Sequence, residues 1–266
     1  MAERIEYKDA AQVRAMRDAG LVVAEALAAV REAMRVGITT AQLDEIAAGV
    51  IAAAGAVPSF LGYQGYPATV CVSVNDEVVH GIPGPRVLEP GDVVSVDCGA
   101  IVDGWHGDAA FTAVLPEADP ADAALVAATE HALWEGIAAL ASGDRLGAVG
   151  EAIESSVTGH GIVEEYVGHG IGSAMHQPPE VLNHRSRRPG PRVTAGMCVA
   201  IEPMLTRGSP RTRVLADGWT VATVDGTRAA HWEHTVAVCP GGVWVLTAPD
   251  GGAEQLSLRG VSVAPW

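Results

Sequence analysis

Two helices followed by several strands are expected twice along this chain, and this repeated order limits the fold more than any other feature. In the first half, apolar residues recur at helical spacing over residues 10–36, up to Gly37. Thr39 and Gln42 form a capping box, which starts a second helix that runs to about Ala54. Strand-like runs follow at residues 69–74, 93–97, 101–102 and 111–115.

The second half shows the same order of elements. Helices are expected over residues 121–141 and 146–158, and strands dominate after Tyr166. The two halves, about 10–116 and 120–246, share no clear sequence identity, so only the pattern of elements relates them. We therefore expect one α+β domain that contains a pseudo-repeat, with a seam rather than a linker between the halves.

Composition and charge exclude several classes of protein. Of the 266 residues, 48% are hydrophobic, so the chain can bury a sizeable core. The net charge of -15 argues against general affinity for nucleic acid, which relies on clustered Lys and Arg. No stretch approaches the ~20 apolar residues of a membrane helix, and residues 1–6 do not resemble a secretion signal. These features predict a cytoplasmic protein that binds no membrane.

The cysteines do not predict a metal or redox motif. No two of them form a Cys-x-x-Cys pair, and all lie in apolar, strand-like runs, so we expect reduced and mostly buried thiols. The four are Cys71, Cys98, Cys198 and Cys239.

The first candidate for chemistry is a pair of acids. Asp103 and Gly104 stand between two β-prone runs, which predicts a hairpin. Asp97 ends the strand before that turn and Asp108 lies just past the hairpin, so the two carboxylates are expected side by side. Close carboxylates are unfavourable unless a cation lies between them. Taken alone, a solvated acid at a strand end is the commoner explanation.

A glycine-rich stretch with two histidines is the second candidate. His169 lies within Gly168–Gly172, and His176 follows it. Glycines on both sides of a histidine permit close approach of the backbone, which suits a ligand or substrate site. A lone histidine here would more often be a hydrogen-bonded core residue, and the second histidine makes the two interpretations about even.

Two glutamates inside apolar runs are the third candidate. Glu202 follows Val199-Ala200-Ile201, and Glu233 lies in a run that continues to Val236. A buried carboxylate costs several kcal/mol unless it is paired or bound to metal. Lys8 is the only lysine and basic neighbours in sequence are scarce, so metal binding is favoured over a buried ion pair.

Together these residues supply four carboxylates and one imidazole. Such a set suits Mn, Fe(II), Co or Zn in a paired site, and suits a structural zinc poorly. Two metals of this kind support hydrolysis of an amide or an ester.

At these residues the sequence resembles the type I methionine aminopeptidases, from about residue 10 to about residue 246. Five blocks in the family's order carry the resemblance: residues 71–83 with His80, 103–108 with Asp108, 168–172 with His169, 201–204 with Glu202, and 233–235 with Glu233. A single block would be weak evidence, whereas five in order are not expected by accident.

The resemblance implies the pita-bread fold, with two pseudo-symmetric halves around a curved antiparallel sheet in a single catalytic domain over residues 1–266. It implies removal of the initiator methionine from nascent proteins and peptides whose second residue is small, by a metal-bound hydroxide at a dinuclear site. The implied ligands of the two divalent ions are Asp97, Asp108, His169, Glu202 and Glu233, with Asp108 and Glu233 bridging.

The resemblance also implies roles for other residues. His80 and His176 would face the substrate and aid the transition state, and Glu202 would also move a proton. For the residues of the methionine pocket, ordinary core packing is the alternative. The implied pocket consists of Phe60, Tyr63, Tyr66, Cys71, Met175 and Trp219. Departures from the family at Cys98, Gly99, Phe60 and Met175 leave the exact shape of this pocket open.

The sequence also bears on partners and on alternative functions. A monomer of the short bacterial form is expected, and the Arg-rich stretches 185–192 and 207–213 are either ribosome contacts or plain solvated loops. One rival is a prolidase or proline-specific aminopeptidase of the same fold, although such relatives usually carry an extra N-terminal domain. The other rival is a binding module that has lost its metals, but all five ligand positions are retained here.

Overall fold

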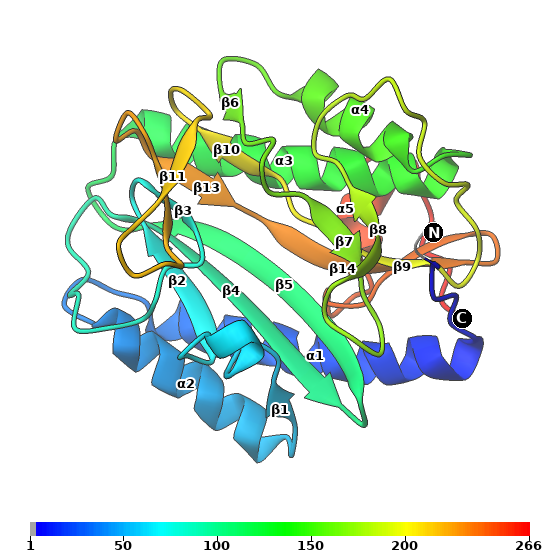
Figure 1. Cartoon of the computed structure of the whole chain (residues 1–266), viewed down its shortest axis with the longest axis horizontal. Helices are drawn as coiled ribbons and strands as arrows, with labels where there is room; N and C mark the ends of the chain where they lie inside the picture. Colours follow the sequence, from blue (N-terminus) through cyan, green and yellow to red (C-terminus); the bar gives the residue numbers. More distant parts are fainter. Residues whose placement is uncertain (1–3) are drawn as a thin grey trace.

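The computed structural model describes residues 4–266 and contains one large sheet with helices on its outer sides (Figure 1). The sheet has nine strands in the order β1-β4-β5-β14-β9-β7-β8, and β2 and β15 pair with β4 and β14. Its strands are β1 (Val57–Pro58), β2 (Val70–Val74), β4 (Val93–Val102), β5 (Trp105–Val114), β7 (Gly168–Gly170), β8 (Gln177–Val181), β9 (Cys198–Ile201), β14 (Glu233–Cys239) and β15 (Gly242–Val245).

The helices form one pair in each half of the chain. Figure 1 shows α1 and α2 along the lower strands and α3 and α4 along the upper ones, which leaves the face toward the viewer open. The pairs are α1 (Ala10–Ala33) with α2 (Thr40–Ala53), and α3 (Pro120–Ser142) with α4 (Gly147–Ser156). The expected order of two helices and then strands in each half is therefore confirmed.

The capping box that was expected at the start of the second helix is present. The Thr39 hydroxyl accepts a hydrogen bond from the backbone N–H of Gln42, and the Gln42 side chain accepts one from the Thr39 N–H. Helix α1 ends at Ala33, before the expected end at residue 36, and Gly37 adopts a positive φ in the turn that follows. A short helix α5 (Ala253–Ser257) was not expected from the sequence.

The hairpin around Asp103 and Gly104 is confirmed, but the strands on either side of it are longer than expected. Both turn residues have positive φ, at 48° and 81°, and Val102 pairs with Trp105. Strands β4 and β5 are continuous, so Asp97 and Asp108 lie within strands and not at strand ends. The sequence pattern breaks at these acids because it records apolar residues, whereas the ladder of backbone hydrogen bonds does not depend on side-chain polarity.

Two small sheets lie beside the large one. One has the order β13-β10-β6 and the other β11-β12-β3. Their strands are β3 (Glu77–Val79), β6 (Gly161–Ile162), β10 (Met204–Thr206), β11 (Thr212–Val214), β12 (Val221–Thr223) and β13 (Ala229–His231). Strands do dominate after Tyr166, although the short β6 precedes it. Arg213 lies in β11, so the expectation of a loop throughout 207–213 was wrong at its end.

Very close packing joins α1 to the sheet. An added Cβ at Gly20 of α1 would lie 2.3 Å from the carbonyl oxygen of Leu246, and one at Gly107 of β5 would lie 2.7 Å from the Gly20 nitrogen. The backbones of the helix and the hairpin therefore touch, and this contact supports the strand that carries Asp108.

The four cysteines are free and buried, as expected. Within residues 4–266, every helix falls short of what crossing a bilayer requires.

Gly20→Ala and Gly49→Ala are expected to change the free energy of unfolding in opposite directions. At Gly20 the methyl group meets backbone atoms that cannot move aside, so we expect a loss of about 1–3 kcal/mol. Exposed Gly49 lies in α2 with no atom within 4 Å of the added Cβ, so alanine should gain about 0.5–1 kcal/mol from helix propensity. Urea denaturation of both variants measures this, and equal effects would contradict the close helix–sheet contact.

Candidate metal centre

The five implied metal ligands come from five neighbouring strands of the large sheet, one from each. Strands β4, β5, β14, β9 and β7 stand in this order in the sheet. Asp97 lies in β4, Asp108 in β5, Glu233 at the start of β14 and His169 in β7, and Glu202 directly follows β9. Residues more than 130 positions apart in the chain are thereby brought to one place.

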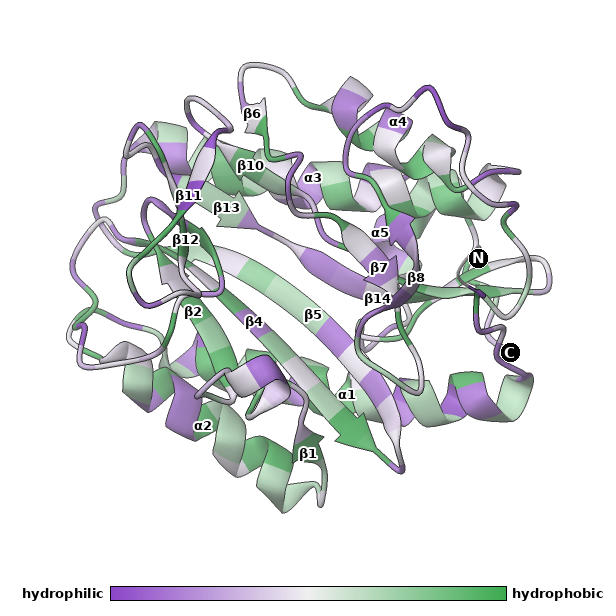
Figure 2. Ribbon diagram, viewed as in Figure 1, coloured by the Kyte–Doolittle hydropathy of each residue, from purple (hydrophilic) through white to green (hydrophobic). Residues whose placement is uncertain are grey.

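The register of the strands puts these side chains on one face. Ala110 of β5 pairs with Asp97 on one side and with Glu233 on the other, and Asp108 is two residues away on the same strand. Because side chains alternate between the faces of a sheet, residues at these positions share a face. Ile201 pairs with His234, which brings Glu202 beside Glu233. In Figure 2, hydrophilic segments interrupt β5, β14 and β7, which belong to this part of the sheet.

The glycines around His169 are required by close approach of the backbone, as expected. An added Cβ at Gly168 would lie 2.3 Å from the Ala200 carbonyl oxygen, and one at Gly170 would lie 2.2 Å from that of Pro178. His169 Nδ1 donates a hydrogen bond to the Gly170 carbonyl oxygen at 3.0 Å. The lone pair of Nε2 then points toward the acids, 3.5 Å from Glu202 Oε1, which is the tautomer that a metal ligand needs.

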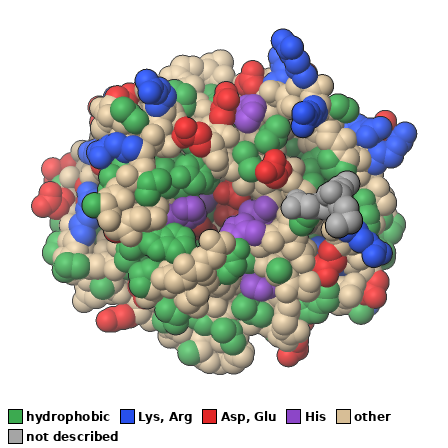
Figure 3. Space-filling model, in the orientation of Figure 1, with side chains coloured by type: hydrophobic (Ala, Val, Ile, Leu, Met, Phe, Trp, Pro, Cys, Tyr) green, Lys and Arg blue, Asp and Glu red, His purple; other side chains and the backbone are tan. Residues whose placement is uncertain are grey.

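The acids form the floor of a cavity of about 180 Å³. Figure 3 shows this hollow near the centre of the face, with acidic side chains inside it and histidines at its edge. Its lining residues are Phe60, Tyr63, Gln64, Tyr66, Cys71, Val79, His80, Asp97, Asp108, His169, Met175, His176, Glu202, Trp219 and Glu233. The structure therefore brings every residue that the resemblance implied into one cavity. Their individual roles stay predictions.

Burial and mutual repulsion make the ionised form of this cluster unfavourable in the protein without metal. Burial raises the pKa of Asp97 to about 7. Burial, followed by the charges of neighbouring carboxylates, raises the pKa of Asp108, Glu202 and Glu233 well above their usual ranges. Burial lowers the pKa of His169 to about 3, so this imidazole is neutral and free to bind a metal.

Within the described part of the chain, the cluster has no Lys or Arg partner. Among residues 4–266, histidines are the only basic side chains that come within 4.0 Å of these carboxylates. One buried oxygen each of Asp97, Asp108 and Glu233 has no hydrogen-bond partner. The alternative that the sequence left open, in which Glu202 and Glu233 form buried ion pairs with basic residues, is therefore wrong. Donors of Asp108, His169 and Glu233 lie within 4.8 Å of one another, as do those of Glu202, His231 and Glu233, so the residues fit divalent metal.

Two histidines stand where the cavity opens. His80 follows β3 with φ of 61°, an uncommon conformation for a non-glycine residue, and its ring contacts Tyr166 and Trp219 edge-on. His176 is exposed, its Nδ1 lies 2.8 Å from the Tyr63 hydroxyl oxygen, and its ring centroid lies 4.3 Å from that of His169. Both rings can therefore reach a molecule held above the acids.

The apolar wall of the cavity is a separate small cluster, packed apart from the main core. Its buried members include Phe60, Tyr66, Cys71 and Met175, with Tyr63 and Trp219 packed against them. The Tyr66 hydroxyl lies 3.0 Å from the Gly81 carbonyl oxygen and 3.1 Å from that of Val70, so this polar group is already satisfied. The wall offers contact surface and no charged group to a side chain that enters.

Sequence reasoning missed three residues of the site. Gln64 and Val79 line the cavity, and His231 contacts the acids. His231 stands two residues before Glu233, so strand alternation could have suggested that both face the same side. Gln64, in the turn before β2, carries no comparable signal because turns have no periodic pattern.

Comparison with known proteins is decisive here. The model for metallopeptidase family M24 matches residues 14–240. Methionine aminopeptidase 1 of Mycobacterium tuberculosis is 52% identical over 91% of this chain and 95% of its own, and that of Bacillus subtilis is 44% identical over 87% and 94%. The chain belongs to the methionine aminopeptidases of family M24. Membership in this metallopeptidase family implies a divalent metal cofactor and hydrolase activity.

Solved structures also show similarity to methionine aminopeptidases. The crystal structure of methionine aminopeptidase from Thermotoga maritima matches this chain with a TM-score of 0.89 and 39% sequence identity, over 92% of this chain and 99% of the other. Prolidase from Pyrococcus furiosus has a TM-score of 0.71 and 18% identity, and this chain covers 65% of it. The prolidase shares the pita-bread fold alone, so the first rival is not supported.

Asp97→Asn is expected to stabilise the metal-free protein increasingly as pH rises from about 4 to about 7. The pKa of Asp97 is raised from 3.8 to about 7, so in this range the folded state keeps a proton that the unfolded state loses. Wild-type stability therefore falls as pH rises through this window, and an uncharged side chain avoids that loss. Urea denaturation with chelator at several pH values measures the difference, and a difference independent of pH would contradict the shift.

Proposed function

We propose that this methionine aminopeptidase removes the N-terminal methionine from nascent proteins and peptides whose second residue is small. The observation that carries the proposal is the cavity itself, in which five metal-binding donors lie directly beside a wall of apolar and sulfur-containing side chains. A peptide end placed in it would have its first side chain against the wall and its first carbonyl near the acids. Relatives named methionine aminopeptidase support the proposal.

The donor set supports a centre of two divalent ions. Asp97, Asp108, His169, Glu202 and Glu233 would hold them, with Asp108 and Glu233 shared between the ions, and Mn, Fe(II), Co and Zn all suit mixed oxygen and nitrogen donors. When bound, such a pair supplies a nucleophile at neutral pH and a Lewis acid for the peptide carbonyl. Binding would also remove the repulsion among the acids.

The remaining chemistry belongs to three side chains. His176 would donate a hydrogen bond to the carbonyl oxygen as it gains charge, and the Tyr63 hydroxyl at its Nδ1 would keep the ring in place. His80, which lines the same cavity, would also contact the substrate. Glu202, whose carboxyl lies beside His169, would hold a proton and pass it to the departing amine.

The pocket supports methionine as the preferred first residue. An unbranched thioether adapts to an irregular apolar slot lined by Phe60, Tyr66, Cys71 and Met175. A charged first side chain would lose its hydration in this slot without gaining a partner. We further propose that the chain works as a single catalytic domain over residues 1–266, as a monomer in the cytoplasm.

Metal-stripped protein should release methionine from Met-Ala-Ser only after Mn, Co, Fe(II) or Zn is added back. His176→Ala should lower kcat/KM by roughly 10²–10³-fold through loss of an oxyanion donor. Glu202→Ala should lower it by at least roughly 10²-fold through loss of proton transfer. Chromatographic assay of free methionine measures these changes, and an Xaa-Pro dipeptide in the same assay should not be cleaved.

Two results would overturn this assignment. Faster cleavage of the Xaa-Pro dipeptide than of Met-Ala-Ser would point to a prolidase. No methionine release with any metal, from folded protein that binds metal, would support the binding module without catalysis.

We also propose that the Arg-rich loop over residues 185–192 contacts ribosomal RNA beside the nascent chain. Arg145, Arg185, Arg187 and Arg188 line one surface cavity together with Asp144 and Glu151, which leaves an excess of positive charge there in a chain of net charge -15. Most of this loop is exposed.

Replacing Arg187, Arg188 and Arg192 by Gln should reduce co-sedimentation with ribosomes, and the reduction should be largest at low salt. A control variant with Arg4, Arg14 and Arg35 changed to Gln loses the same charge from exposed positions outside both Arg-rich stretches. Co-sedimentation that survives the loop variant, or falls equally in the control, contradicts a specific contact by this loop.

A further inference from the structure

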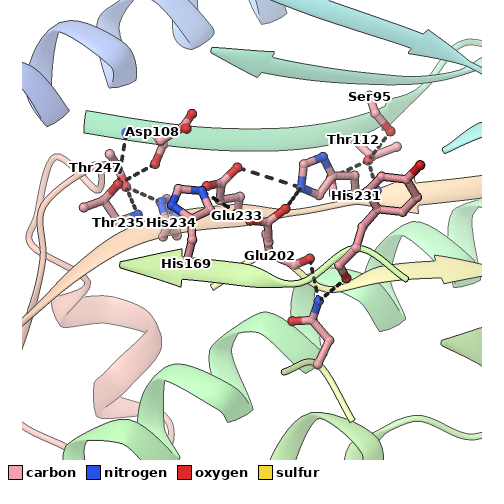
Figure 4. Close-up of polar contacts among 12 residues, drawn as sticks. Ser95, Asp108, Thr112, His169, Glu202, His231, Glu233, His234, Thr235 and Thr247 are labelled. Atoms are coloured by element: carbon pink, nitrogen blue, oxygen red, sulfur yellow. Dashed lines mark hydrogen bonds and ion pairs between the residues drawn. The ribbon is translucent and has the colours of Figure 1, made fainter. Parts of the chain in front are cut away.

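His231 is a buried histidine of the site with no assigned role. It ends β13, and only 1% of it is exposed. Its Nε2 has no hydrogen-bond partner within residues 4–266. That nitrogen lies 3.8 Å from Glu233 Oε2 and 4.0 Å from Glu202 Oε2, and Figure 4 shows the ring directed toward both carboxylates. A neutral donor atom is thus buried against two acids without bonding to either.

The distances from His231 Nε2 to the two carboxylates fit atoms that bind one ion together better than atoms joined by a hydrogen bond. Hydrogen bonds between nitrogen and oxygen span about 2.7–3.2 Å, which both contacts of His231 Nε2 exceed. Two donors that bind one divalent ion at about 2.0–2.2 Å each are instead separated by about 3–4 Å. The separation of His169 Nε2 from Glu202 Oε1, 3.5 Å, falls in the same range.

The backbone of His231 is fixed independently of its ring. Its N–H donates to Thr112 Oγ1 at 2.9 Å, and the Thr112 hydroxyl donates to the His231 carbonyl oxygen at 2.7 Å. Thr112 Oγ1 also lies 2.8 Å from Ser95 Oγ, and His231 pairs with Met204 of β10. These contacts, drawn in part in Figure 4, fix the backbone from which the imidazole projects toward the acids.

We propose that His231 is a further metal ligand through Nε2, together with Glu202 and Glu233. The inference deepens the dinuclear centre proposed above and rests on it. The donors form two overlapping groups that share Glu233, one with Asp108 and His169 and the other with Glu202 and His231. Each group contains one imidazole, so both ions would have a nitrogen ligand. Such a centre favours Fe(II), Co and Zn over Mn more strongly than a centre in which one ion has only oxygen ligands.

Titration of the metal-free protein with Co(II) tests this assignment without relying on activity. Visible absorption reports the ligands of Co(II), and calorimetry reports affinity and stoichiometry. His231→Ala and His231→Gln should both alter the absorption bands. Both should also weaken one step of Co(II) binding by at least roughly 10–100-fold, which is the loss in affinity caused by removing a residue that only supports a metal ligand. Gln keeps a hydrogen-bond donor of similar reach but no imidazole, so it should not restore the wild-type spectrum.

His106→Gln is the matched control. This histidine also belongs to the sheet, in β5, but its Nδ1 lies 3.0 Å from Ser59 Oγ, outside both donor groups. Its Co(II) spectrum and affinity should match those of the wild type. A His231→Gln variant that also matches the wild type in both measurements would overturn the inference while leaving the dinuclear centre intact. Wild-type protein that binds no Co(II) would instead overturn the centre itself.

A measurement on the unmutated chain covers the case in which the His231 variants do not fold. In protein labelled with ¹⁵N-histidine, added Zn²⁺ should move the Nε2 resonances of both His169 and His231. Movement of the His169 resonance alone would show that His231 is not a ligand.

Discussion

Repulsion among four carboxylates that share one cavity is the constraint on which the rest of this site depends. Asp97, Asp108 and Glu233 are buried, Glu202 is nearly so, and no Lys or Arg within residues 4–266 comes close enough to neutralise them. Their raised pKa values record how unfavourable the charged cluster is without metal. The cluster therefore costs stability, and a divalent metal bound by these acids would offset that cost.

A sheet is a suitable support for such a cluster. Each donor stands on its own strand, and the ladders of backbone hydrogen bonds fix the spacing between strands regardless of the repulsion between side chains. Thr235 strengthens this framework, because its hydroxyl accepts from the Asp108 N–H and donates to the Asp108 carbonyl oxygen. Helix α1 adds support from behind through the backbone contact at Gly20 and Gly107.

In the proposed function, the apolar wall sets selectivity and the acids and histidines beside it carry the chemistry. The wall is a small cluster apart from the main core, but its member Cys71 belongs to β2 of the large sheet and pairs with Asp97. Tyr63 links the two functions, since its ring belongs to the wall and its hydroxyl contacts His176. His80, held at positive φ, likewise packs on Trp219 of the wall. A change in the pocket is therefore expected to reach the histidines at its opening.

The sequence by itself indicated helices α1 to α4, the Asp103–Gly104 hairpin and five candidate donor residues, because these depend on local patterns: capping boxes, turn residues and polar residues inside apolar runs. It could not determine that β4 and β5 continue through Asp97 and Asp108, since apolar periodicity stops at a charge whereas backbone pairing does not. Strand alternation can suggest that His231 and Glu233 share a face, but the sequence could not determine that Glu202 lies there too or that the His231 nitrogen is left unbonded. Those features arise only when β9 and its following residue pair beside β14, because they depend on distances between separate segments of the chain.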